Sequence, residues 1–170
     1  RAEDAQDGRV NLLTCFDNEV KVELGTPTKE SGEAALKALD RAMTDFRSQL
    51  YDVLVACPVD NTNMSSDNYS YKNLKEYSET SIGDGAKGVK IMINESLRIA
   101  LATDGLAIKD VSANLTEERL MAKIKALHTS IKRDFRISNP RIAVLALNPN
   151  ANGAEENDTI IPAIKKSEEN

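Results

Sequence analysis

The sequence predicts an α/β fold in which a mainly parallel sheet is flanked by helices and carries one antiparallel hairpin. Continuous apolar runs of strand length, at residues 52–59 and 141–147, are typical of strands that are buried on both faces. Longer segments between such runs repeat their apolar residues every three or four positions, as amphipathic helices do. Two further short apolar runs lie so close in sequence that we expect them to pair antiparallel.

The first elements are two strands and a helix. Residues 10–16 and 19–24 are predicted strands joined by a hairpin turn at Asp17-Asn18. A helix follows residues 25–28, with Thr as its N-cap and Pro near its first turn. Its apolar stripe comprises Leu36, Leu39, Met43, Phe46 and Leu50. The alanines beside this stripe would let the helix lie close to a sheet.

The middle of the chain, from residue 60 to residue 88, is polar and is expected to be irregular apart from a short helix at 73–80. Glycines at 83, 85 and 88 match the spacing of a dinucleotide-binding loop, but they precede a strand instead of following one. We therefore interpret them as a turn. Residues 89–93 and 97–103 are the two runs that should pair antiparallel.

The last third of the chain supplies a second long helix, a strand and a final helix. Asn114 or Thr116 is expected to cap the long helix. Residues 160–166 are expected to begin the final helix. The apolar stripe of the long helix comprises Leu120, Ile124, Leu127 and Ile131. With no linker or repeat in view, residues 1–170 are predicted to form a single domain, with residues 1–8 and 165–170 as frayed tails.

Composition excludes several classes of function. A net charge of −5 without any basic run argues against a nucleic-acid partner. No stretch approaches the roughly 20 apolar residues that span a bilayer, and the polar first residues lack a signal peptide. Because Cys15 and Cys57 lie in apolar runs, we expect two buried free thiols and a cytoplasmic location.

Few residues suggest chemistry by themselves. His128 is the only histidine, and a lone histidine on a helix is typical of a structural or exposed position. The carboxylate pairs Glu117-Glu118 and Glu155-Glu156 are adjacent in sequence, so their members do not face each other on a helix. We interpret both pairs as structural, and no nucleophile, base and acid can be assembled around a single histidine.

Several blocks nevertheless occur in the order found in one enzyme family. The most specific are Asp134-Phe135-Arg136-Ile137, Pro140-Arg141-Ile142-Ala143-Val144-Leu145-Ala146-Leu147-Asn148-Pro149 and Ile160-Ile161-Pro162-Ala163-Ile164. Together with Asp52-Val53-Leu54-Val55-Ala56-Cys57-Pro58-Val59, they make nearly the whole chain resemble the central domain of 4-hydroxythreonine-4-phosphate dehydrogenases.

The resemblance implies a fold like that of isocitrate and isopropylmalate dehydrogenases, and an NAD-dependent oxidation in pyridoxal phosphate biosynthesis. It also implies self-association, because the family forms homodimers partly through this region. Family members bind a divalent metal through three histidines and hold the phosphorylated substrate with a His-Thr pair. The metal would act as a Lewis acid on the substrate oxygens.

This sequence departs from the family at each of those places. Leu74 and Lys75 stand where the family has its His-Thr pair, and Gly105 and Asn150 stand where it has its first two metal histidines. The third histidine would lie beyond residue 170. The positions concerned, called the vestigial-site positions below, are Asp60, Asn61, Leu74, Lys75, Asp104, Gly105 and Asn150.

Glycine has no ligand atom, and an amide oxygen replaces imidazole poorly. We therefore predict that the chain has no catalytic, cofactor-binding or metal-binding residue. We expect a non-catalytic domain, either a relic or an engineered scaffold, without NAD or a metal. The alternative is a diverged NAD-dependent dehydrogenase fragment that another chain completes. A third hypothesis is a binding module that uses the polar residues near Lys75, Asp104 and Asn150.

Overall fold

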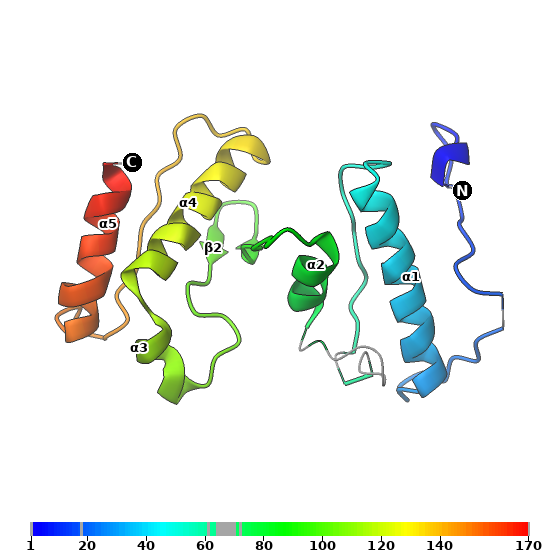
Figure 1. Ribbon diagram of the computed structural model, residues 1–170, viewed down its shortest axis with the longest axis horizontal. Coiled ribbons are helices and arrows are strands. Elements are labelled where there is room, and N and C mark those ends of the chain that lie inside the picture. Colours follow the sequence, from blue (N-terminus) through cyan, green and yellow to red (C-terminus); the bar gives the residue numbers. More distant parts are fainter. Residues whose placement is uncertain (1, 18, 61, 64–70, 72, 170) are drawn as a thin grey trace. The chain divides into compact units, whose positions relative to one another are not determined.

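The computed structural model describes residues 2–17, 19–60, 62, 63, 71 and 73–169 (Figure 1). The chain divides into two compact units, Arg1–Lys87 and Gly88–Asn170, here called unit 1 and unit 2. Each has its own hydrophobic core, and each is described by itself. Whether the two units make up the single domain expected over residues 1–170 stays a prediction.

Unit 1 contains a short 3-10 helix and two α-helices. They are η1 (Ala2–Asp4), α1 (Lys29–Arg47) and α2 (Leu74–Ile82). The predicted Thr cap is confirmed, because the Thr28 hydroxyl accepts a hydrogen bond from the Ser31 N–H and the Ser31 hydroxyl oxygen accepts one from the Thr28 N–H. This reciprocal capping box satisfies two donors that a helix start leaves open.

The core of unit 1 lies between α1 and α2. The predicted stripe of α1 supplies most of it, and Tyr77 of α2 completes it with 1% exposure. The Tyr77 hydroxyl donates to Asp40 Oδ1 at 2.6 Å, so the one polar atom of this ring is satisfied. The buried cluster comprises Leu36, Leu39, Met43 and Tyr77. Leu50 belonged to the predicted stripe, but α1 ends before it.

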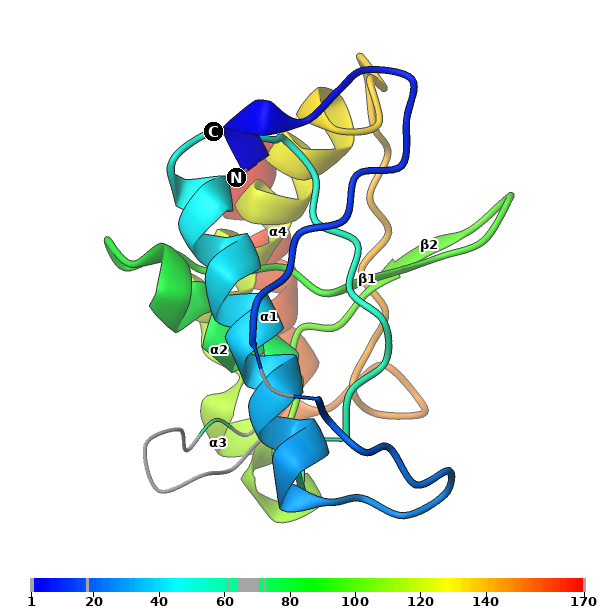
Figure 2. The same cartoon turned by 90° about the vertical axis from the view of Figure 1, so that its right-hand side faces the viewer.

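Unit 2 contains one hairpin and a set of helices. Its elements are β1 (Ile91–Ile93), β2 (Arg98–Ala100), η2 (Ile108–Asp110), α3 (Val111–Asn114), α4 (Glu117–Arg133), the π-helical turn η3 (Glu156–Ile160) and α5 (Ile161–Glu168). The predicted antiparallel pairing is confirmed, with Met92 opposite Ile99 (Figure 2). Thr116 caps α4 by accepting from the Arg119 N–H, which decides between the two predicted caps.

The core of unit 2 lies between α4 and α5, which are side by side in Figure 1. Leu120 comes from the predicted stripe of α4, and Ala163 of α5 is fully buried. Val144, in the extended run 141–147, packs against the same cluster from outside the helices. The buried cluster comprises Leu115, Leu120, Ile160 and Ala163.

The apolar runs predicted as further strands are extended but unpaired. Within the described residues, β1 and β2 form the only ladder, and residues 10–17, 51–60 and 141–147 belong to none. The mainly parallel sheet is therefore not confirmed. An isolated strand gains no stabilisation from its backbone until a neighbour pairs with it.

The exposure of these runs follows from the missing partners. Val55 and Leu145 are 87% and 86% exposed. The two thiols are free as expected, but the prediction that both are buried is wrong, because Cys15 is half-buried and Cys57 is exposed. Among the described helices, none is long and apolar enough to cross a membrane.

Candidate functional site

The vestigial-site positions fall in both units. Unit 1 carries Asp60, Leu74 and Lys75, and unit 2 carries Asp104, Gly105 and Asn150, whereas Asn61 lies outside the described residues. Leu74 and Lys75 are neighbours at the start of α2, and Asp104 and Gly105 are neighbours in the loop that follows β2. Asn150 lies in a separate loop of unit 2, ahead of η3.

The start of α2 shows what Leu74 and Lys75 do here. Asn73 caps the helix by accepting from the Glu76 N–H at 3.0 Å. Leu74 packs against the unit 1 core, and its side chain has no polar atom that could bind a phosphate. Lys75 Nζ lies 3.2 Å from Glu79 Oε1 in an i,i+4 ion pair between two half-buried side chains. Of the two, Lys75 alone keeps a group able to attract an anion.

Asp60 closes a local turn. Its Oδ1 accepts from the Thr62 hydroxyl at 2.7 Å and from the Thr62 N–H at 2.9 Å. These hydrogen bonds, led by that of the hydroxyl, lower the pKa of the Asp60 carboxyl. The side chain therefore acts as a turn-forming acceptor, which is a frequent structural role of aspartate.

Gly105 has a positive φ of 74°, and a Cβ added there would meet nothing within 4 Å. Space is therefore available at this position, but the left-handed backbone favours glycine. Asp104 beside it is half-buried. The loop offers no side chain at 105 and one carboxylate at 104.

The loop that carries Asn150 is held by Glu156, and we call this arrangement the Glu156 clamp. Glu156 Oε1 accepts from the N–H groups of Leu147 and Asn148, both at 2.8 Å. Its Oε2 accepts from the Gly153 N–H and from Asn148 Nδ2, also at 2.8 Å. Glu156 is 3% exposed. Four donors thus converge on one nearly buried carboxylate.

The hydrogen bonds that Glu156 accepts favour the charged form of its carboxyl group. The donors favour the ionised form and lower the pKa of Glu156 to about 2, with the Asn148 N–H and side chain contributing most. Glu155 extends the network, because its Oε1 accepts from the Ser112 hydroxyl at 2.6 Å and its Oε2 from Asn148 Nδ2 at 3.0 Å. These contacts agree with the prediction that the pair Glu155-Glu156 has a structural role.

Gly153 is required by the Glu156 clamp. A Cβ there would lie 2.3 Å from Asn148 Nδ2 and 2.8 Å from Glu156 Oε2. The sequence analysis did not identify the clamp, although a signal existed: Gly-x-x-Glu places the carboxylate three residues after the N–H that it accepts from, as in a capping box. The sequence does not show that the Glu156 carboxylate also accepts hydrogen bonds from residues 147 and 148.

The residues present do not fit the metal that the resemblance implies. Gly105 has no side-chain ligand atom, Asn150 offers a neutral amide, and Glu156, which holds the Asn150 loop, already accepts four hydrogen bonds. Within the part of the chain that the structure describes, no three His, Cys, Asp or Glu side chains are placed to hold an ion. His128 is exposed on α4.

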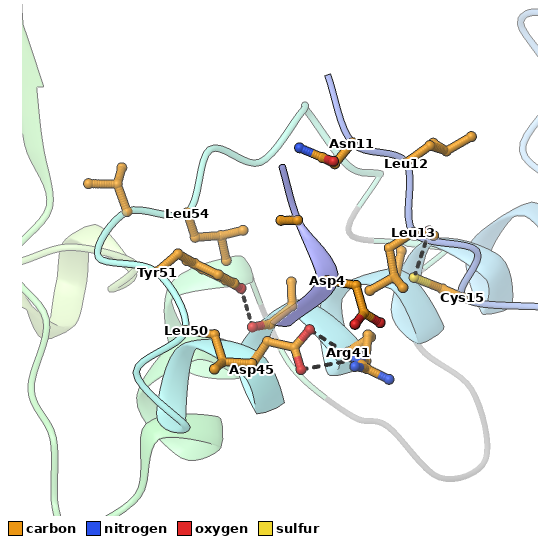
Figure 3. A pocket seen from close by; sticks show the side chains of 14 residues that line it. Asp4, Asn11, Leu12, Leu13, Cys15, Arg41, Asp45, Leu50, Tyr51 and Leu54 are labelled. Carbon is orange, nitrogen blue, oxygen red and sulfur yellow. Dashed lines mark hydrogen bonds and ion pairs between the residues drawn. The ribbon is translucent and has the colours of Figure 1, made fainter. Parts of the chain in front are cut away.

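A separate cavity of about 590 Å³ lies in unit 1, and we call it the α1 groove (Figure 3). It is lined by Asp4 and Ala5 at the end of η1, by residues of the segments 11–15 and 50–54, and by α1, where Ala38 and Ala42 present small side chains. In Figure 3, Leu12 and Leu13 lie on one wall and Leu54 on the other. No sequence motif pointed to this feature.

Comparison with known proteins gives a consistent result. The family model described as "Pyridoxal phosphate biosynthetic protein PdxA" matches residues 1–170. A 4-hydroxythreonine-4-phosphate dehydrogenase of Bacteroides thetaiotaomicron is 39% identical over 99% of this chain, and one of a Sulfurihydrogenibium species is 31% identical over 92%. One of Acidithiobacillus ferrooxidans is 36% identical over 77%. The resemblance stated from the sequence blocks is confirmed.

The matched region is only part of those relatives. It covers 48%, 49% and 40% of the three chains, respectively, so this chain spans about half the length of the curated relatives it matches or less.

Proposed function

Because this chain belongs to the family of the pyridoxal phosphate biosynthetic protein PdxA, we propose that residues 1–170 form a non-catalytic member of it. The proposal concerns the loss of chemistry, and both a relic and an engineered origin are compatible with it. The framework blocks of the family are kept, while the side chains that would bind metal and phosphate are replaced.

The observation that carries the proposal is the Asn150 loop. An amide stands where the family has a metal histidine, and the loop around it is held by an internal carboxylate whose oxygens are already engaged. Leu74 supports the same conclusion, because it contributes to packing at the position of a substrate-binding side chain. No catalytic step through a metal or a nicotinamide cofactor is therefore proposed.

The test is an assay of the purified chain with 4-hydroxythreonine 4-phosphate, NAD and a divalent metal. We expect no NADH above the blank, and no binding of Zn²⁺ or Mg²⁺ at micromolar concentration by calorimetry. The dehydrogenase from Bacteroides thetaiotaomicron is the positive control. Turnover by this chain alone, or stoichiometric metal binding, contradicts the proposal.

A second candidate function is a diverged NAD-dependent dehydrogenase fragment that another chain completes. It is supported by the 39% identity to the Bacteroides thetaiotaomicron dehydrogenase over 99% of this chain. An identity of this size means that the chain shares far more than a few framework residues with that enzyme. Restored NADH formation after addition of a partner chain would favour it over the first proposal.

Three finer features are proposed on the strength of family membership. We propose that the unpaired runs 10–16, 52–59 and 141–147 are strands of a mainly parallel sheet of the isocitrate dehydrogenase type, completed in a longer family protein. We propose a cytoplasmic location, supported by two free thiols. We also propose self-association, which sedimentation of the purified chain tests directly.

A further inference from the structure

Asn152 and Gly153 form the only Asn-Gly pair in the sequence, and they lie in the loop that the Glu156 clamp holds. Asparagine is a thermolabile residue, and it is most reactive before glycine, because no Cβ hinders attack of the next backbone nitrogen on its side chain. Asn152 is exposed, and its side chain forms no hydrogen bond with any described residue. Its amide group is therefore free to approach the neighbouring peptide.

The reaction open to this pair is the loss of ammonia from Asn152. The Gly153 nitrogen attacks Asn152 Cγ, so that the N–Cγ bond forms, the Cγ–Nδ2 bond breaks, and ammonia leaves with the proton of the Gly153 N–H. Water then opens the succinimide ring at either carbonyl, which gives aspartate or isoaspartate. The net reaction consumes water and releases ammonia, and it needs no cofactor or oxidant.

The Glu156 clamp holds the peptide that would have to react. The Gly153 N–H donates to Glu156 Oε2 at 2.8 Å, and the Gly153 carbonyl accepts from the Asn157 N–H at 3.2 Å and from Asn157 Nδ2 at 3.0 Å. Hydrogen bonds to a charged acceptor are stronger than neutral ones, and a pKa of about 2 keeps Glu156 charged at neutral pH. The Gly153 nitrogen can attack only after its N–H leaves this carboxylate.

The clamp also requires the glycine of this pair. A Cβ at 153 would lie 2.3 Å from Asn148 Nδ2 and 2.8 Å from Glu156 Oε2, so another residue there would displace both groups. Asn152 itself is exposed and makes no contribution to the clamp. The loop therefore combines an obligatory glycine with an asparagine side chain that is free to react.

We propose that Asn152 is a deamidation site that the Glu156 clamp keeps unreactive in the folded chain. Local opening of the loop releases the Gly153 nitrogen and allows the modification. The product carries a new carboxylate one residue before the N–H that Glu156 holds, and isoaspartate also lengthens the backbone there. Both changes disfavour closure of the clamp, because like charges repel and the loop no longer has its original length. The inference is independent of the proposed loss of catalysis.

The experiment is incubation of the purified chain at mildly alkaline pH and physiological temperature. Peptide mapping by mass spectrometry then measures the asparaginyl, aspartyl and isoaspartyl forms of the peptide that contains Asn152. We expect Glu156→Gln to raise the deamidation rate at Asn152 about tenfold or more, because weakening a hydrogen bond to a charged group releases the Gly153 N–H.

Two further variants serve as controls, and circular dichroism verifies that each variant is folded. Glu155→Gln removes the neighbouring carboxylate, whose hydrogen bonds go to residues 112 and 148 and not to Gly153, so the rate at Asn152 should stay unchanged. Asn152→Gln should abolish the modification, because the ring that would have to form is one atom larger and closes slowly.

Each other result overturns the proposal. No acceleration in Glu156→Gln, or equal acceleration in Glu155→Gln, would mean that the clamp does not protect Asn152. A slower reaction in Glu156→Gln would make Glu156 the base for the attack instead of its barrier.

If Glu156→Gln does not fold, the unsubstituted chain decides the question. Its rate at Asn152 should be lower by about tenfold or more in buffer than in denaturing urea. At intermediate urea concentrations the rate should rise in parallel with hydrogen exchange of the Gly153 N–H. A rate in buffer equal to that of the unfolded chain overturns the proposal.

Discussion

The Glu156 clamp and the α1 groove both include irregular segments, but within the described residues the backbone of one is held by a carboxylate, whereas that of the other belongs to no ladder. In the clamp, the N–H groups of the loop converge on a carboxylate from its own unit, and the loop is closed upon itself. In the groove, two extended segments keep their backbones unpaired and their apolar side chains exposed. The first region is complete within this chain, whereas the second has surface that another strand could cover.

The difference bears on the proposed loss of chemistry. The clamp holds the Asn150 loop by contacts within unit 2, because a buried carboxylate with four donors is satisfied by itself. The groove is lined by segments that pair with no other described segment. The two regions can therefore be tested separately.

The largest effect should come from the core of unit 2. Ile160→Ala removes a side chain that is 5% exposed, and we expect a loss of about 2–5 kcal/mol in the free energy of unfolding. Val55→Ala, at a position that is 87% exposed, should change it by no more than about 0.5 kcal/mol. Urea unfolding of both variants measures the contrast, and similar losses would mean that the extended run is covered.

The next effect concerns charge in the Glu156 clamp. The folded pKa is lowered from 4.5 to about 2, so the unfolded chain binds more protons between these values and stability falls as the pH drops through this window. We expect Tm to decrease from pH 5 toward pH 2, and Glu156→Gln to lower Tm at neutral pH while flattening this dependence. An unchanged pH profile in the variant would show that Glu156 is not the titrating group.

A smaller effect is expected at Gly105. Its φ of 74° lies in the left-handed region, so Gly105→Ala should cost about 1–2 kcal/mol even though its Cβ would have free space. Gly105→Asn should cost less, because asparagine tolerates this conformation better than alanine. Chemical denaturation distinguishes the two, and equal losses would point to a contact of the side chain instead of backbone strain.

The smallest effect should come from Lys75. Its i,i+4 ion pair with Glu79 joins two half-buried side chains, so Lys75→Met should change the free energy of unfolding by no more than about 1 kcal/mol. Added salt should reduce even this difference. A larger loss would indicate that Lys75 has a structural role beyond the pair.

The sequence predicted the parts of the fold that depend on local rules. A Thr cap, a short helix at 73–80 and antiparallel pairing of 89–93 with 97–103 are predicted from capping residues, apolar spacing and a short turn. The structure has the cap at Thr28, the helix at Leu74–Ile82 and Met92 opposite Ile99. The parallel sheet could not be settled in this way. Its runs 52–59 and 141–147 have the right composition, but pairing needs distant partners that local patterning does not specify.

From the sequence, the candidate site could be predicted only as a set of positions at which this chain departs from the family it resembles. The resemblance points to Leu74, Gly105 and Asn150 as replaced positions, and the chemistry of their side chains is the reason for expecting no family role there. The Glu156 clamp required coordinates, because its donors come from residues 147, 148 and 153 and converge only when the loop folds back. The α1 groove likewise depends on two segments that lie far apart in the sequence.

The placement of the aromatic residues gives an optical means of separating the two units. The chain has no tryptophan, and its four tyrosines, Tyr51, Tyr69, Tyr71 and Tyr77, all belong to unit 1. Tyr71 and Tyr77 meet edge to face with ring centroids 5.2 Å apart. Intrinsic tyrosine emission should therefore report the melting of unit 1 alone, while far-ultraviolet dichroism reports the helices of both, so a single unlabelled sample reveals whether the units unfold together.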